Sequence, residues 1–295
     1  MLEYCRLENG NLTVEVVPER GGKTISIFDK LHKFELLFQR ADFGTRAVDI
    51  GSPFGQGDAS GFDDAFPGID REQVMINGET VVYPDHGEVW SCRMDRIDFD
   101  DNCDKPYIVL AMDSRILPYH YEKKIQLTDS NEVTYSYLIQ NTGTFAFPCL
   151  WACHCLVRYE EDMRLIYPEG VTEFQTVLNQ EAYPPRYDYG RVPPRQMASM
   201  VKYYALGKVS RGYCGYDYPT QGMQCRFHYD SEKLPYLGFW LTAGGYQGDY
   251  NCALEPTNGY YDNIATARKN HACYSLMPGE TFQFDFKVTL NPITF

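Results

Sequence analysis

The chain has 295 residues, of which 44% are hydrophobic and 23% are charged, a balance typical of a globular protein and not of a disordered chain or a coiled coil. Its 27 Lys and Arg residues against 40 Asp and Glu residues give a formal charge of −13. Nucleic acids and anionic membranes both require a basic face, so this charge argues against either as a partner. The sequence has no run of 18 apolar residues and no secretory signal at its start. We therefore expect a cytoplasmic protein whose ten cysteines are free thiols.

Alternating apolar and polar residues predict strands along almost the whole chain. The first of these strands are expected at 12–17, 24–28, 107–112, 119–127 and 132–140, the last two flanking a hairpin loop. A long apolar strand is expected at 146–159, followed by shorter ones at 225–229, 236–241, 251–255 and 272–276. Residues 281–290 alternate without a break, and only 195–205 suggests a short helix. The pattern predicts one large antiparallel all-β domain over residues 1–295.

Turns and irregular segments separate these strands. Three Asn-Gly pairs, at 9–10, 77–78 and 258–259, predict turns with positive φ. Residues 40–70 and the Pro-rich residues 183–196 show little alternation, and long loops of this kind are either functional or simple surface crossovers.

His154 stands out because it lies in the apolar segment 146–159. In an extended strand its neighbours on both faces are apolar, so the strand should be buried on both sides. A buried imidazole needs a partner or a cavity. His154 is therefore either a satisfied core histidine or an acid/base group on the floor of a polar pocket.

The cysteines around His154 do not favour a metal site. Cys153, His154 and Cys155 are adjacent, so on a strand their side chains point alternately to opposite faces. The chain also has no C-x-x-C pair. We expect no metal.

Two further segments carry chemistry. Glu255 ends an apolar strand just before a Pro-Thr-Asn-Gly turn, where it is either a pocket-rim carboxylate or an ordinary exposed charge. The segment 61–71 brings together acids, including Asp63 and Asp64, with Arg71 and two aromatic residues. Planar polar groups beside aromatic rings suit sugar binding, and a solvated acidic loop is the alternative.

In their order along nearly the whole chain, these segments resemble the aldose 1-epimerase (galactose mutarotase) family. The motifs that carry the resemblance are residues 9–18 with Gly21-Gly22, Phe66-Pro67 with Arg71, Asn77-Gly78 with His86-Gly87, Asn141-Thr142-Gly143 with His154, Gly238-Phe239-Trp240, Leu254-Glu255-Pro256 and Met277-Pro278-Gly279. The chain departs from the family pattern at Asp70-Arg71-Glu72. The family's substrate-binding aspartate has no evident counterpart, and Asp217 and Asp249 are the alternatives.

The resemblance implies a β-supersandwich of large antiparallel sheets with a sugar bound on a concave face. It implies that Glu255 takes the proton of the C1 hydroxyl and that His154 donates one to the ring oxygen, with a neighbouring carboxylate keeping the imidazole protonated. His86, catalytic or positioning, and Arg71 would hold the ring oxygen and hydroxyls. Asp63, Asp64 and Trp240 complete the expected substrate-binding set.

The resemblance therefore implies an isomerase that needs no cofactor. Its partner would be a small sugar, bound by a monomer or homodimer. Two alternatives remain. One is a carbohydrate-binding or sensing protein without turnover. The other is a sugar-phosphate epimerase, with Arg186, Arg191 and Arg195 of the Pro-rich segment holding the phosphate.

Overall fold

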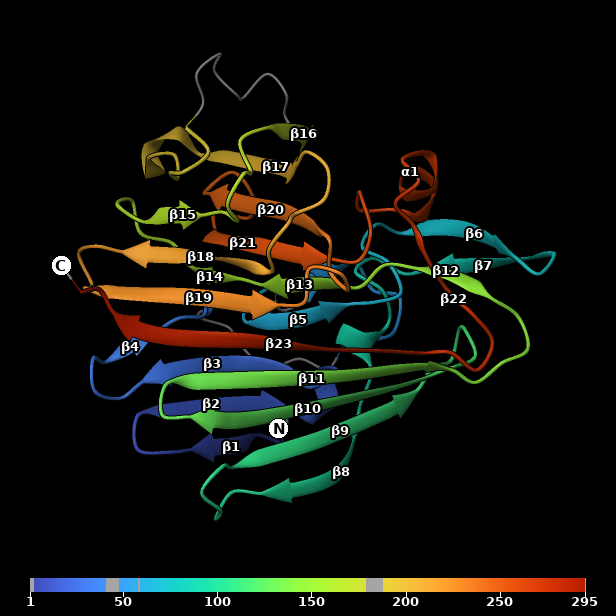
Figure 1. The fold of residues 1–295 in the computed structure, drawn as a ribbon, viewed down its shortest axis with the longest axis horizontal. Coiled ribbons are helices and arrows are strands. Elements are labelled where there is room, and N and C mark those ends of the chain that lie inside the picture. The colour runs from blue at the N-terminus through green and yellow to red at the C-terminus, as the bar shows by residue number, and fades with distance from the viewer. Residues whose placement is uncertain (1–2, 41–47, 58, 179–187, 295) are drawn as a thin grey trace.

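The computed structural model describes residues 3–40, 48–57, 59–178 and 188–294. Within these residues most of the regular structure is antiparallel strand, arranged in two large sheets and two small two-stranded sheets (Figure 1). This confirms the predicted all-β class with large antiparallel sheets.

The larger sheet has the strand order β1-β2-β3-β5-β13-β21-β20-β17-β16, with β4 paired to β3 and β14 paired to β21. Its strands are β1 (Cys5–Glu8), β2 (Leu12–Val17), β3 (Lys23–Asp29), β4 (Phe34–Glu35), β5 (Phe62–Ala65), β13 (Ala152–Cys155), β14 (Val157–Arg158), β16 (Phe174–Leu178), β17 (Ser199–Ala205), β20 (Tyr236–Ala243) and β21 (Tyr250–Thr257).

The second sheet has the order β15-β18-β19-β23-β11-β10-β9-β8. Its strands are β8 (Asp95–Asp100), β9 (Tyr107–Asp113), β10 (Tyr119–Asp129), β11 (Glu132–Asn141), β15 (Arg164–Ile166), β18 (Tyr213–Tyr218), β19 (Met223–Tyr229) and β23 (Thr281–Pro292). The small sheets pair β6 (Glu72–Ile76) with β7 (Glu79–Tyr83) and β12 (Phe147–Cys149) with β22 (Tyr274–Leu276).

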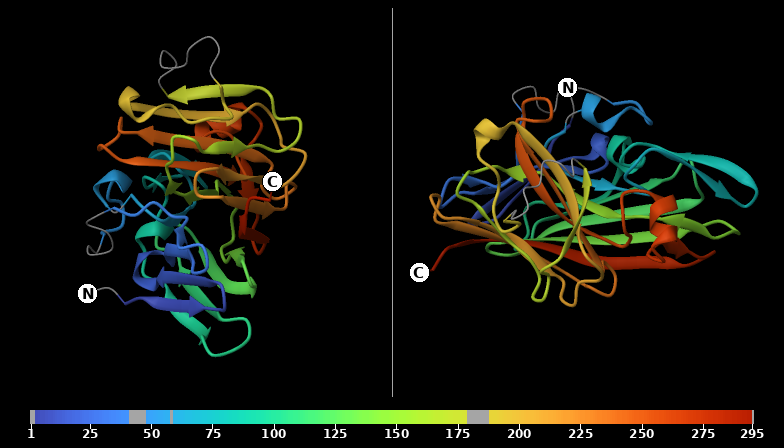
Figure 2. Two further views of the ribbon diagram at one scale, coloured as in Figure 1. Left: turned by 90° about the vertical axis from the view of Figure 1, so that its left-hand side faces the viewer. Right: turned by 90° about the horizontal axis from the view of Figure 1, so that it is seen from above.

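The hydrophobic core lies between the two large sheets, which face each other in the side view (Figure 2). Residues on β23 alternate between buried and more exposed positions, as the sequence pattern predicts. Phe284 on β23 packs against Tyr137 of the neighbouring strand β11, with ring centroids 4.9 Å apart. It also packs against Trp151, which directly precedes β13 of the larger sheet, at 4.7 Å. The contact with Trp151 links the second sheet to the larger one, whose other face is left to form a site.

Helical structure is short. Asn263 caps α1 (Ile264–Lys269) by accepting a hydrogen bond from the Thr266 backbone N–H. Short 3-10 turns occur at Pro18–Arg20, Phe54–Gln56, Val89–Ser91 and Arg195–Met197. Over the described parts of the chain, no helix has the length and apolar character needed to cross a membrane.

Two predicted elements are corrected. The helix expected at 195–205 is a 3-10 turn, Arg195–Met197, followed by strand β17, because β16 and β20 pair with β17 on both sides. The long strand expected at 146–159 is three strands, since β12 pairs with β22 while β13 lies between β5 and β21.

Of the three Asn-Gly pairs, only Asn77-Gly78 has positive φ at both residues, 49° and 85°. Asn9 instead accepts hydrogen bonds from the backbone N–H groups of Asn11 and Leu12. Asn258 similarly accepts one from the Trp151 backbone N–H. Side-chain bonding therefore replaces the expected turn geometry in the other two pairs.

Candidate active site

Strand β13 places His154 on the face of the larger sheet that points away from the core. Its neighbours Cys153 and Cys155 belong to the hydrophobic core, whereas His154 lines a pocket. The strand is buried on both faces, as predicted. His154 Nδ1 is buried and has no hydrogen-bond partner among the described residues. Of the two alternatives in the sequence, the structure therefore favours the imidazole in a pocket over the satisfied core histidine.

Strands β17, β20 and β21 supply the opposite side of the pocket. Their register places Lys202 beside Trp240, and Gly238 beside Glu255. A side chain at Gly238 would have its Cβ only 3.1 Å from Glu255 Oε2 and from the Tyr204 ring, so glycine leaves room for the carboxylate.

Glu255 is buried next to a lysine and a second carboxylate. Lys202 Nζ lies 2.8 Å from Glu255 Oε2 and 3.2 Å from Asp262 Oδ1. Glu255 Oε1 has no hydrogen-bond partner among the described residues. Burial raises the pKa of Glu255, and the nearby Asp262 raises it further, while Lys202 opposes both. A carboxylate with a raised pKa and an oxygen that no described residue binds is suited to accept a proton.

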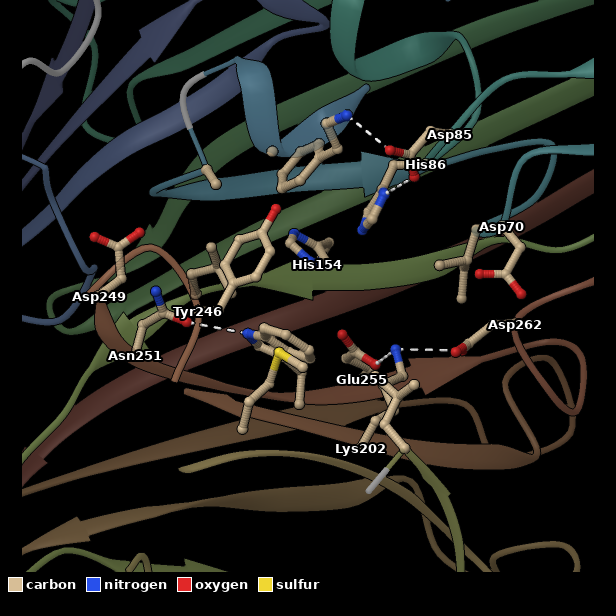
Figure 3. A pocket seen from close by; sticks show the side chains of 18 residues that line it. Asp70, Asp85, His86, His154, Lys202, Tyr246, Asp249, Asn251, Glu255 and Asp262 are labelled. Atoms are coloured by element: carbon tan, nitrogen blue, oxygen red, sulfur yellow. Dashed lines mark hydrogen bonds and ion pairs between the residues drawn. The ribbon is translucent and has the colours of Figure 1, made fainter. Parts of the chain in front are cut away.

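His86 lies on a tight turn at the other wall. Its φ is 57°, and the following Gly87 has no space for a side chain because a Cβ would lie 1.9 Å from the Phe66 carbonyl oxygen. His86 Nδ1 lies 2.7 Å from Asp85 Oδ1. Burial raises the pKa of Asp85, but the hydrogen bond and charge of His86 outweigh it, so that pKa is lowered overall. Asp85 therefore orients the ring and leaves the second nitrogen for the pocket (Figure 3).

The two histidines and Phe54 form one group of rings. Phe54 stacks on His86 with a centroid distance of 4.1 Å and meets His154 edge-on at 4.7 Å. The His86 and His154 rings also meet edge-on, at 4.7 Å. Burial lowers the pKa of His154 well below its ordinary value, and His86, Lys202 and Lys23 lower it further. This direction is opposite to the expected protonated His154, because burial and the charges of His86, Lys202 and Lys23 disfavour the imidazolium form.

Together these residues line a cavity of about 310 Å³. Figure 3 shows His154 near its centre, Glu255 with Lys202 and Asp262 below, and Asp249 at the opposite end from Asp262. The polar groups lie beside rings, in an arrangement that suits a polyhydroxylated ring. The lining residues are Phe54, Gly55, Ala59, Ile69, Asp70, Asp85, His86, His154, Leu156, Leu178, Met200, Lys202, Trp240, Tyr246, Asp249, Asn251, Glu255 and Asp262.

The structure thus brings His86, His154, Trp240 and Glu255 together and does not bring Arg71, Asp63 or Asp64 to the lining. Asp64 lies in the core, where it pairs with Lys123. Asp63 is buried opposite His154 on β5 and pairs with Lys23 at 2.6 Å.

Arg71 is exposed and outside the lining, which corrects its expected contact with the sugar. It precedes β6, a strand paired with β7 away from the large sheets. Asp217 also lies elsewhere, paired with Arg226 on the second sheet. Of the two alternatives for a substrate-binding aspartate, only Asp249 lines the pocket.

The arginines suggested for a phosphate do not line this pocket in the described parts of the chain. Arg191 lies near Asp188, Arg195 lines a neighbouring cleft, and Arg186 is outside the described residues.

Sequence reasoning missed Lys202, Asp262 and Asp85. Lys202 lies in the segment expected to be helical, and its charge interrupts an otherwise apolar strand, a signal that could have been used. Asp85 directly precedes His86, where a carboxylate could have been expected to orient the ring. Asp262 follows β21 in an irregular segment, and no sequence pattern connects it to Lys202. Among the residues that the structure describes, no His, Cys, Asp and Glu side chains form a group that could hold a metal ion.

No protein-family model and no curated protein matches the chain. Solved structures do match it over nearly its full length. A protein from Synechocystis is 16% identical, with a TM-score of 0.77 over 99% of this chain and 97% of that one. A galactose mutarotase-like protein from Clostridium acetobutylicum is 14% identical, with a TM-score of 0.73 over 99% and 96%. A galactose mutarotase related enzyme from Lactobacillus acidophilus is 12% identical, with a TM-score of 0.72 over 99% and 100%.

The chain has the galactose mutarotase-like fold. This confirms the architecture that the sequence resemblance implies. What the fold's pocket does in this chain depends on its own residues, since one fold hosts several functions.

Proposed function

We propose that this protein is an aldose 1-epimerase, which interconverts the α and β anomers of a sugar by acid/base ring opening. The observation that carries the proposal is that His154 and Glu255 line one pocket, each with a buried polar atom that no described residue satisfies. Buried polar groups are nearly always satisfied, so an unsatisfied one needs an explanation, and binding of a ligand in the pocket supplies it here.

Glu255 is the base of the proposed reaction. Its open Oε1 takes the proton of the C1 hydroxyl, while Lys202 holds Oε2 and fixes the direction of the carboxylate. The raised pKa of Glu255 makes it a stronger proton acceptor than an exposed glutamate. Asp262 also forms an ion pair with Lys202, so it limits how strongly the lysine lowers the pKa of Glu255.

The two imidazoles act at the ring oxygen. Burial and the nearby cations favour the neutral form of His154, so its imidazole forms a hydrogen bond with the ring oxygen of the sugar. His86, oriented by Asp85, donates the proton to that oxygen. The C1–O5 bond breaks as the C1 hydroxyl becomes a carbonyl. Rotation about C1–C2 and closure on the other carbonyl face, with both proton transfers reversed, give the other anomer.

The remaining lining residues are suited to holding the sugar. Trp240 offers an aromatic face, and its indole N–H is 3.2 Å from Asn251 Oδ1, which fixes both side chains. Asp249 and Asn251 supply hydrogen-bonding oxygens at the end of the pocket away from Asp262 (Figure 3). A cavity of about 310 Å³ is sufficient for one sugar ring.

Polarimetry of freshly dissolved sugars tests this proposal. The panel holds glucose, galactose, xylose and arabinose, with glucose 6-phosphate as the phosphorylated arm. Wild type is expected to accelerate mutarotation of at least one free sugar. His86→Gln removes the proposed proton donor and should slow it by about 100-fold with the fold intact by circular dichroism. Binding without acceleration would replace the proposal with a sugar-binding protein, and acceleration of the phosphate alone would replace it with a sugar-phosphate epimerase.

A further inference from the structure

A second cleft lies beside the candidate active site. It has a volume of about 710 Å³, and Asp249 lines both the cleft and the pocket. Within the pocket, Asp249 is at one end, with His154 and Glu255 between it and Asp262 (Figure 3). The shared Asp249 places the cleft directly next to the pocket that His154 and Glu255 line.

Two of the arginines in this cleft already have acidic partners. Arg40 Nη1 lies 3.5 Å from Asp249 Oδ2. Arg158 is paired with Glu160. The positive charges of Arg40 and Arg158 are therefore compensated by these carboxylates.

Arg195 differs from both. Its guanidinium carbon lies 4.5 Å from the Tyr250 ring centre and 5.0 Å from that of Tyr159, and Nη2 donates one hydrogen bond to the Tyr159 carbonyl oxygen at 3.2 Å. Across the described ranges, no carboxylate forms an ion pair with this guanidinium. Two tyrosine rings and one backbone contact therefore hold a cation whose other N–H donors are available.

This arrangement has a defined ligand chemistry. A guanidinium with available donors binds carboxylate or phosphate oxygens through paired, charge-assisted hydrogen bonds. The partly exposed Tyr250 adds aromatic surface of the kind that sugar rings contact, whereas Tyr159 is buried. The chain as a whole carries a charge of −13, so a local cation is needed for an anionic group to bind here.

We propose that the cleft is a second sugar subsite, which holds an anionic unit next to the reducing sugar, with Arg195 binding its acidic group. This inference rests on the proposed function, because it places the reducing end in the pocket with His154 and Glu255. It extends that function from a free monosaccharide to the reducing end of an acidic oligosaccharide.

The test compares matched sugars. Cellobiouronic acid carries a carboxylate on its non-reducing unit, cellobiose is its neutral counterpart, and cellobiose 6′-phosphate carries the alternative anion. Glucose fills the pocket alone. Anomer exchange at the reducing end is followed by NMR for each, with wild type, Arg195→Met and Arg191→Met. Arg191 is the matched control, because it lies on the same segment but outside the cleft lining.

The expected result is a higher kcat/KM for an acidic disaccharide than for cellobiose and glucose. Arg195→Met should lower that kcat/KM by about 10- to 100-fold and change the values for cellobiose and glucose by no more than about twofold. Arg191→Met should leave all values within about twofold of wild type. The carboxylate and phosphate arms report which anion Arg195 prefers.

An acidic disaccharide that reacts no better than cellobiose, or an equal loss for charged and neutral sugars in Arg195→Met, would overturn the proposal. If wild type accelerates no sugar at all, the proposed function fails and calorimetric binding of cellobiouronic acid decides the subsite separately. Binding that Arg195→Met weakens at least tenfold and Arg191→Met does not would retain the subsite, and any other binding result would reject it.

Discussion

Of the buried lysine–carboxylate pairs among the described residues, Lys123–Asp64 and Lys202–Glu255 have similar chemistry in different surroundings. In the core, Lys123 Nζ lies 2.8 Å from Asp64 Oδ2 and 3.2 Å from the Gly22 carbonyl oxygen, and Tyr137 donates a hydrogen bond to Asp64 Oδ1. In the pocket, Lys202 pairs with Glu255 at the same distance of 2.8 Å, but Glu255 Oε1 has no partner among the described residues.

The comparison separates a structural ion pair from a chemical one. The core carboxylate has both oxygens bound and lies in the hydrophobic interior, so it has no atom left for a substrate. The pocket carboxylate lines a cavity and has one oxygen without a hydrogen-bond partner among the described residues. Burial and charge pairing alone do not identify a reactive carboxylate. A carboxylate that lines a cavity and has an oxygen without a hydrogen-bond partner is the better indicator.

The largest expected effect is on stability, in the core. Asp64→Asn should lower the free energy of unfolding by about 3–5 kcal/mol, because it leaves the Lys123 ammonium buried without a counter-charge. Denaturant titration measures this. The double variant Asp64→Leu/Lys123→Met removes both charges and should recover most of the loss.

Glu255→Gln should change the same free energy by less than about 1 kcal/mol, since Asp262 remains beside Lys202. A loss of unfolding free energy as large as that of Asp64→Asn would show that the Lys202–Glu255 pair is also structural. It would contradict the distinction between the two ion pairs.

A smaller effect concerns pH. Glu255 must be ionised to accept a proton, so activity is present above its raised pKa and falls as the pH drops through it. Lys202→Met removes the cation that opposes this rise, so the acid limb of kcat/KM should move to higher pH. Activity near pH 6 should fall by about 10-fold or more, and activity near pH 9 by less. An unmoved acid limb would show that another group controls it.

A smaller kinetic effect is expected at the second wall of the pocket. Asp85→Asn keeps the size of the side chain but removes the charge that orients His86. We expect kcat to fall by about tenfold, equivalent to one charge-assisted hydrogen bond of about 1.5 kcal/mol. Asp113→Asn is the control, because Asp113 pairs with His120 on the second sheet. Equal effects of the two variants would contradict the proposed role of Asp85.

The smallest effect is expected at Arg71. Its side chain is exposed and outside the pocket lining, so Arg71→Ala should leave kcat/KM within about twofold of wild type. A loss of tenfold or more in steady-state kinetics would restore the sugar contact that the family resemblance implies.

The sequence predicts the fold better than the site. Unbroken alternation at 281–290 and the 119–127 and 132–140 pair identified β23, β10 and β11, because each strand has one buried face. The helix prediction for 195–205 was wrong because pairing with strands on both sides determines the conformation of this segment, and those strands are distant in sequence. The local hydrophobic pattern predicts a strand well where one face of the strand is buried. It predicts poorly where pairing with distant strands determines the conformation.

The site shows the same limit. His154 and Glu255 were identifiable as titratable residues in apolar segments. The contact between Lys202, Glu255 and Asp262 joins residues 53 and 7 positions apart through sheet pairing and an irregular segment, which no spacing rule predicts. Asp63 and Asp64 were wrongly grouped by adjacency, since neighbouring residues on a strand face opposite sides.

The most direct test of Glu255 as the base is the anomer exchange rate of Glu255→Gln, measured by saturation-transfer NMR at pH 7.5 with the sugar that wild type accelerates most. Sugar affinity is measured in parallel by calorimetry. We expect the catalysed rate to fall by about 1,000-fold while the affinity stays within about threefold of wild type. A rate within about twofold of wild type in a folded, sugar-binding variant would contradict the account.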